Sequence, residues 1–127
     1  MPKQKPVVNI RSFGIYTQWN EEAKELPRIL EFTTIVPAEI DIEFGFIANF
    51  KKAKNQLVRY CIYHPGIQDA EGNVRPPFDG EVYVRTNDWD FFLGDTVWAP
   101  IEDKRGCWRM TLEILGEIVA EKSFDVG

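Results

Sequence analysis

The C-terminal stretch of the chain constrains its fold more than any other. Residues 107–114 alternate between apolar and polar side chains, which is the period-two pattern of a strand with one buried face. The pattern breaks at Leu115-Gly116-Glu117 and resumes over 118–126, where Ile118, Ala120, Phe124 and Val126 share one parity. This predicts a β-hairpin. A hairpin buries only one face, so a second sheet must cover Trp108 and Phe124.

Further short strands are expected upstream of this hairpin, where apolar and polar residues alternate. These stretches are 8–19, 30–36, 40–50, 57–64, 81–86, 87–93 and 96–100. Gly14 predicts a bulge or bend in the first strand, and Gly94-Asp95 predicts a turn between the last two. One helical turn is predicted at 20–27. The longest loop is predicted at 65–80, because Gly, Pro, Asp and Asn dominate there.

The strand pattern predicts an all-β protein with no substantial helix. About seven or eight strands separated by turn signals favour an antiparallel β-sandwich of the immunoglobulin-like kind. The 127 residues are expected to form a single domain, residues 1–127. A chain of this length buries roughly two thirds of its unfolded surface without disulfides or metals.

Charge and hydropathy limit the partners that we expect. A net charge of -5 argues against binding to nucleic acid or to anionic lipid, both of which require clustered Lys and Arg. Residues 7–11 cannot serve as the apolar segment of a signal peptide, because Asn9 and Arg11 interrupt them. No stretch has the apolar length of a membrane span. We therefore expect a soluble, cytoplasmic protein with no cofactor and no membrane partner.

Several landmarks along the chain resemble a bacterial family known only as a domain of unknown function. They are Phe13-Gly14-Ile15-Tyr16, residues 34–38, Phe44-Gly45-Phe46, His64-Pro65 followed by Gly72, and Gly106-x-Trp108 with Gly116 and Phe124. The resemblance spans most of the chain and implies an immunoglobulin-like sandwich. It implies no activity and no catalytic residues.

The residues themselves do not assemble into a catalytic set. His64 is the only histidine, and Cys61 lies three positions before it on a predicted strand, so the two side chains point to opposite faces. We expect the imidazole to bond into the loop that begins at Pro65. Cys61 and Cys107 each lie away from the apolar face of their strand, so we favour small filler side chains over a disulfide.

The long loop carries oxygen ligands of the kind that bind calcium, at Asp69, Glu71, Asn73 and Asp79. Gly72 stands too early for an EF-hand loop, however, and Gly and Asn at these positions are typical of a turn. We therefore expect a turn here and no metal site.

The most informative cluster combines aromatic residues with acids. Trp89, Phe91, Phe92 and Trp98 are interleaved with Asp88, Asp90 and Asp95. Exposed rings beside carboxylates can stack on sugars and bond their hydroxyls, whereas a sandwich also needs large side chains to fill its core. We favour packing in the core or at an interface. If the cluster binds a ligand, the candidate residues are Asp88, Trp89, Asp90 and Trp98.

Two functions are compatible with these observations. The first is a non-catalytic protein-interaction or binding module, whose partner is an unidentified protein or a second copy of the chain, joined through an edge strand as a homodimer. The alternative is a domain that binds a small ligand or carbohydrate through the region from Trp89 to Trp98.

Overall fold

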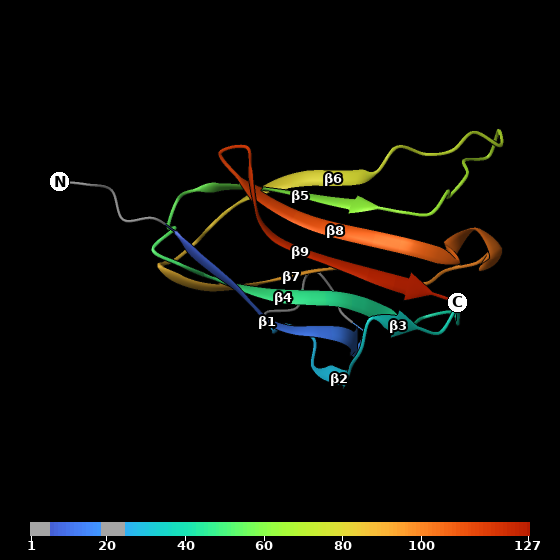
Figure 1. Ribbon diagram of the computed structural model, residues 1–127, viewed down its shortest axis with the longest axis horizontal. Coiled ribbons are helices and arrows are strands. Elements are labelled where there is room, and N and C mark those ends of the chain that lie inside the picture. The colour runs from blue at the N-terminus through green and yellow to red at the C-terminus, as the bar shows by residue number, and fades with distance from the viewer. Residues whose placement is uncertain (1–5, 19–24) are drawn as a thin grey trace.

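Two β-sheets packed face to face make up the protein (Figure 1). The computed structural model describes residues 6–18 and 25–127, so most of the helical turn predicted at 20–27 lies outside the described residues. The first sheet has the strand order β2 (Ile29–Phe32), β1 (Val7–Tyr16), β4 (Glu43–Lys51), β7 (Asp88–Thr96). The second has the order β3 (Ile35–Val36), β9 (Glu117–Val126), β8 (Gly106–Ile114), β5 (Leu57–Tyr63), β6 (Phe78–Tyr83).

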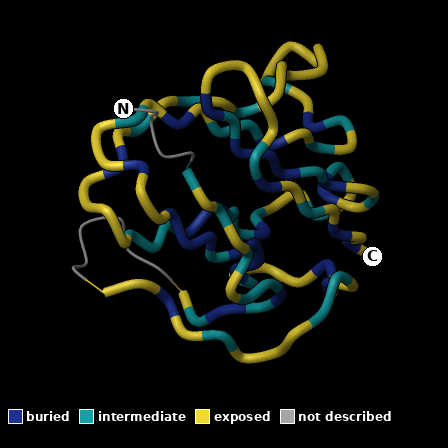
Figure 2. Tube along the Cα trace, turned by 60° about the vertical axis from the view of Figure 1, so that its left-hand side comes forward, coloured by how far each residue is buried: buried dark blue, intermediate teal, exposed yellow. Residues whose placement is uncertain are grey.

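The predicted all-β sandwich is confirmed. Neighbouring strands run antiparallel except β3 and β9, which are parallel. Within the described ranges the helical structure is limited to one 3₁₀ turn, Glu102–Lys104. Buried residues gather between the sheets, and exposed residues follow the turns and loops around them (Figure 2).

The C-terminal hairpin forms as predicted. Leu115 and Gly116 have φ angles of 53° and 80°, which is the left-handed backbone of a two-residue hairpin turn. The buried Trp108 ring meets Phe44 of the first sheet edge to face, with ring centroids 5.2 Å apart.

The expected parity of Ile118 is wrong. A bulge between Leu112 and Glu113 shifts the register, so Ile118 pairs with Glu113 on the outer face and is 49% exposed.

The strand predicted at 30–36 is instead two short strands in different sheets. β2 pairs with β1, whereas β3 pairs with β9. The hydroxyl of Thr33 accepts a hydrogen bond from the Ile35 N–H at 3.0 Å. This local bond forms a turn and replaces the backbone pairing that would continue a single strand. The chain therefore crosses from one sheet to the other at this point.

The turn predicted at Gly94-Asp95 is also wrong, because β7 runs through these residues without a break. Gly94 pairs with Gly45, and Asp95 pairs with Phe44. A Cβ atom at Gly94 would lie 2.4 Å from the Phe92 ring, so this glycine permits close packing rather than a reversal of the chain.

The bulge of β1 also differs from the prediction. Its register with β4 shifts between Ile10 and Ser12, not at Gly14. Gly14 pairs directly with Gly45 of β4, and a Cβ atom at Gly14 would lie 1.9 Å from the Glu31 carbonyl oxygen. The glycine is therefore required by the close approach of β2.

We predict that Gly45→Ala destabilises the protein by more than about 3 kcal/mol. Gly45 has a φ of 156°, and a Cβ atom there would lie 2.1 Å from the Leu93 carbonyl oxygen. Gly66 is the matched control, since its φ is 146° and nothing lies within 4 Å of its added Cβ. Gly66→Ala should cost about 1 kcal/mol. Urea unfolding of both variants measures the difference, and equal costs would contradict the steric argument.

Candidate functional site: a polar pocket on the outer face of the first sheet

Strand β7 divides the predicted site residues between two surfaces. Asp88 and Asp90 point to the outer face of the first sheet, where both bond the side chain of Asn49. Trp89 lies on the inner side and packs against the core, and Trp98 follows the other end of the strand. The structure therefore brings the two acids together and leaves the two tryptophans far apart.

Both tryptophans take part in packing. The half-buried Trp89 ring stacks on Phe91 with centroids 5.3 Å apart, and it lies 5.7 Å from Phe50. The half-buried Trp98 ring lies 6.3 Å from Phe78, and the Nζ atom of Lys104 sits 4.4 Å above it. The two rings do not share a surface on which a ligand could stack.

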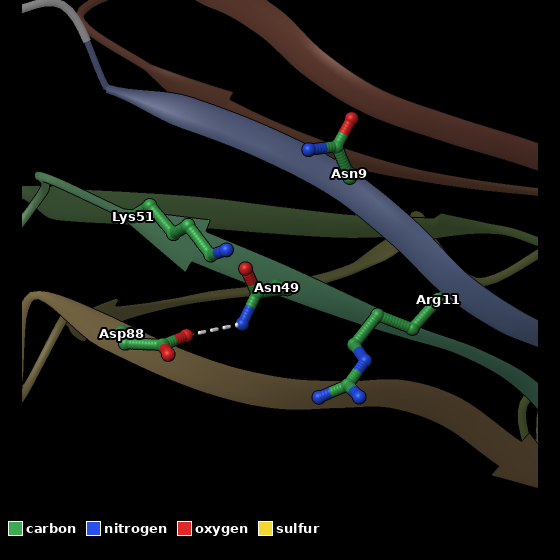
Figure 3. Close-up of a pocket in the computed structure, with 5 residues that line it drawn as sticks. All are labelled: Asn9, Arg11, Asn49, Lys51 and Asp88. Atoms are coloured by element: carbon green, nitrogen blue, oxygen red, sulfur yellow. Dashed lines mark hydrogen bonds between the residues drawn. The ribbon is translucent and has the colours of Figure 1, made fainter.

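A polar pocket of about 330 Å³ lies beside the two acids (Figure 3). Asn9 and Arg11 reach it from β1, Asn49 and Lys51 from β4, and Asp88 from β7. These three strands are neighbours in the first sheet, and their register places Asn9 opposite Asn49 and Lys51 opposite Asp88. The pocket is thus built by side chains that share one face of the sheet.

The bulge in β1 supplies Arg11 to this site. Ile10 pairs with Ala48 on the inner face, and Ser12 pairs with Ile47 on the outer face, so Arg11 is the extra residue between them. Its guanidinium donates to Asp90 Oδ2 at 2.8 Å. This exposed ion pair is worth little stability, but it neutralises one of the two acids.

Asn49 is the central residue of the site. It is 6% exposed, and its amide nitrogen donates to Asp88 Oδ1 at 2.7 Å and to Asp90 Oδ1 at 2.8 Å. A buried amide that satisfies two carboxylates holds both in fixed positions. Figure 3 shows the amide nitrogen directed at Asp88 and the amide oxygen directed away from it.

Lys51 and Asp88 are directly opposite each other yet do not form an ion pair. Among the described residues, no carboxylate lies within 4.0 Å of the Lys51 ammonium, and Asp88 is held by the neutral Asn49 instead. The pocket therefore presents a positive and a negative group side by side.

The sequence indicated only part of this site. Asp88 and Asp90 stand out in the sequence because they flank Trp89, whereas no local pattern points to Asn9, Arg11, Asn49 or Lys51. Asn49 falls on the polar parity of its predicted strand, where nothing distinguishes a buried amide from an exposed one. Arg11 reaches the pocket through a bulge that the sequence places elsewhere.

His64 bonds into the following loop, as predicted. Its Nδ1 atom accepts a hydrogen bond from the Ile67 N–H at 3.0 Å, which leaves the proton on Nε2 to donate to the Pro76 carbonyl at 3.1 Å. Its ring centroid lies 5.0 Å from that of Phe78. Both ring nitrogens are thus engaged by the backbone.

A second charged cluster lies at the Trp98 end of the sandwich. The side chain of Lys104 is 1% exposed and donates to the Pro100 carbonyl at 2.9 Å and to Asp103 Oδ1 at 2.5 Å. Burial raises the pKa of Asp95 to about 6. The hydrogen bond from the Thr96 N–H, and then the electrostatic interactions with His64 and Lys104, lower this pKa but do not offset the effect of burial.

Asp69, an acid of the long loop, bonds backbone groups of the loop itself. Asp69 Oδ1 accepts the N–H groups of Glu71 and Asn73 at 2.9 and 3.0 Å, which forms the predicted turn. In the described part of the chain no three His, Cys, Asp or Glu side chains converge as metal ligands.

Cys61 and Cys107 are free and lie on the outer face of the second sheet.

The fold and this site define an immunoglobulin-like β-sandwich with a polar pocket on one sheet. The chain belongs to the family described as domain of unknown function (DUF3859), whose model matches residues 4–126. No curated protein sequence matches it. No helix in the described ranges is long and apolar enough to cross a membrane.

Solved structures that are similar to this chain include the following two. One is an immunoglobulin-like protein from Pseudomonas aeruginosa, with a TM-score of 0.77 and 21% identity over 98% of both chains, and it confirms the fold. The other is an alkylpurine DNA glycosylase from Pseudomonas fluorescens, bound to DNA that contains an abasic site analog. Its TM-score is 0.48 and its identity 11%, and the match covers 98% of this chain and 31% of the glycosylase.

We predict that the contribution of Asp95 to the stability of the protein falls as the pH rises from about 4 to 6. The folded state keeps the Asp95 proton above the ordinary pKa of 3.8, so it binds more protons than the unfolded state in this window. Asp95→Asn should remove that dependence and stabilise the protein at pH 7 by about 1–2 kcal/mol, allowing for partial solvent access. Thermal unfolding across pH checks this, with exposed Asp125→Asn as control. An unchanged pH profile in Asp95→Asn would contradict it.

Proposed function

We propose that this protein is a non-catalytic interaction module that binds a protein partner through the outer face of its first sheet. The observation that carries the proposal is the pocket in which Lys51 and Asp88 stand side by side without pairing. Opposite charges that do not pair within one protein can each meet a complementary charge on another.

The rigidity of the site supports this function. Asn49 is buried, and it fixes the carboxylates of Asp88 and Asp90 before any partner arrives. A site that is already ordered loses less conformational entropy on binding than a flexible one. Three adjacent strands hold the lining residues, so the backbone is ordered as well.

The surroundings of His64 support a non-catalytic role. A general base needs a ring nitrogen that can reach a substrate, and both nitrogens of this side chain bond backbone groups. The free Cys61 lies on the other face of β5, opposite Thr111, so it has no imidazole to activate it.

Binding of a small ligand or carbohydrate is the alternative. The amides of Asn9 and Asn49 and the carboxylate of Asp88 are groups that bond sugar hydroxyls, and they line the same pocket. Neither Trp89 nor Trp98 lines it, however, so the stacking surface that sugar-binding sites commonly provide is missing from this pocket. A protein partner therefore fits the site better.

We predict that Lys51→Ala reduces capture of the partner at least about fivefold, the loss expected for a charge at an interface. The immobilised protein would be exposed to an extract of a bacterium that encodes the family, and retained proteins quantified by mass spectrometry. Lys54→Ala, an exposed lysine outside the pocket, is the matched control and should retain the partner.

Two results would count against this function. If Lys51→Ala retains the same proteins as the wild type, the pocket is not the contact surface. If an oligosaccharide panel changes the tryptophan fluorescence of the wild type but not of Asn49→Ala, the carbohydrate alternative is favoured. Thermal unfolding of each variant separates loss of binding from loss of fold.

A further inference from the structure

Strand β7 is the outermost strand of the first sheet and pairs only with β4 in the described part of the chain. It is 9 residues long, whereas β2 at the opposite edge has 4. A long edge strand presents a row of backbone donors and acceptors to which another chain can add.

The direction of the free backbone groups follows from the hydrogen bonds of Val97. Its N–H donates to the Ile42 carbonyl, and its carbonyl accepts from the Asp41 N–H, both at 2.9 Å, so this residue bonds toward the β4 side. Bonding direction alternates along an antiparallel strand. The N–H and C=O groups of Asp90 and Gly94 therefore point away from β4, and no partner contacts them among the described residues.

Side chains close both ends of this edge. The Thr86 hydroxyl donates to the Asp88 carbonyl at 2.8 Å, and the Thr96 N–H donates to the carboxylate of Asp95 at 2.8 Å. The outward-pointing groups of Asp90 and Gly94 lie between these two ends. The strand itself, at 9 residues, is long enough for a short strand to be added.

The second sheet extends beyond β7 and leaves a strand position vacant. Phe44 contacts Trp108 of β8 and Phe124 of β9, so β4 lies over these two strands, and the contact of Phe91 with Tyr60 places β7 opposite β5. β6 is the next strand after β5, so no strand of the first sheet lies opposite it in the described ranges.

The burial of β5 and β6 agrees with this vacancy. Val58 and Ile62 on the inner face of β5 are 0% and 5% exposed. Their partners on β6, Val82 and Phe78, are only half-buried, although Phe78 already contacts the rings of His64 and Trp98. An added strand beside β7 would cover Val82.

We infer that β7 receives an extended segment of a partner protein as a fifth strand of the first sheet. The segment would carry basic side chains at alternate positions, next to Asp88 and Asp90 on the outer face. Its intervening side chains would be apolar and would lie over Val82 and the adjoining inner face of β6. This inference rests on the proposed function, because it specifies the partner of the same surface.

Charge decides between this occupant and a second copy of the chain. β7 carries the acids Asp88, Asp90 and Asp95 and no basic residue. Two β7 edges therefore carry charge of the same sign, and like-charge repulsion opposes their pairing. A segment with alternating lysine or arginine complements them instead.

The test uses a fluorescein-labelled peptide of alternating Lys and Val, eight residues long. A peptide of the same composition with four Lys followed by four Val is the control. Fluorescence anisotropy should show at least tenfold tighter binding of the alternating peptide to the wild type. Asp88→Lys, at an exposed position, should weaken that binding at least fivefold and favour an alternating Glu-Val peptide.

The backbone is tested separately. Asp90→Pro removes an N–H that points away from β4, so the fold should tolerate it, and binding should fall at least tenfold. Asp90→Asn retains the backbone N–H, so its binding of the peptide should fall less than that of Asp90→Pro. In the wild type, the alternating peptide should slow hydrogen exchange at the Asp90 and Gly94 amides. The exchange measurement does not depend on any variant folding.

Each contrary result is specific. Equal binding of the two lysine peptides, or unchanged exchange at Asp90 and Gly94, overturns the strand-addition proposal. Protection of these amides by self-association, with a dimer seen by light scattering, would assign the edge to a second copy. If strand addition fails while Lys51→Ala still loses the captured partner, the proposed function stands without it. If the peptide binds but capture of the partner does not depend on Lys51, strand addition is supported and the proposed role of the pocket is wrong.

Discussion

The packing of Phe44 against Trp108 and Phe124 joins the two sheets, and the remaining structure depends on it. The ring centroids lie 5.2 and 5.6 Å apart, and all three side chains are buried. This contact fixes β4 in the middle of the molecule, with its inner side chains enclosed by the C-terminal hairpin. Since β4 also has neighbours on both sides, the rest of the first sheet is positioned relative to it.

The outer face of β4 is covered as well, which explains its unusual composition. Gly45 lies in register with Gly14 and Gly94 on the two neighbouring strands, which forms a row without side chains. Tyr16 and Phe92 lie on the rows to either side of it, and their rings, with centroids 4.9 Å apart, pack over the glycines. Aromatic rings that cover strand glycines in this way restore lost packing. The polar pocket is therefore confined to the other end of the face.

The pocket and the free edge of β7 are neighbouring features of one surface. Asp88 and Asp90 belong to both, because their side chains line the outer face while their strand forms the edge of the sheet. Asn49 holds these acids in place from the adjacent strand. A partner that adds to β7 would therefore approach charges that are already ordered.

The sequence by itself determined the sandwich and its closing hairpin, because period-two alternation and a Leu115-Gly116 turn are local properties of the chain. It also placed His64 in its loop. Only the tertiary structure decided that Gly94 continues a strand, since that depends on its fit against Phe92. The polar pocket also depends on tertiary structure. Asn49 is buried and bonded to Asp88 only because sheet register brings separate strands together, and no local pattern encodes that register.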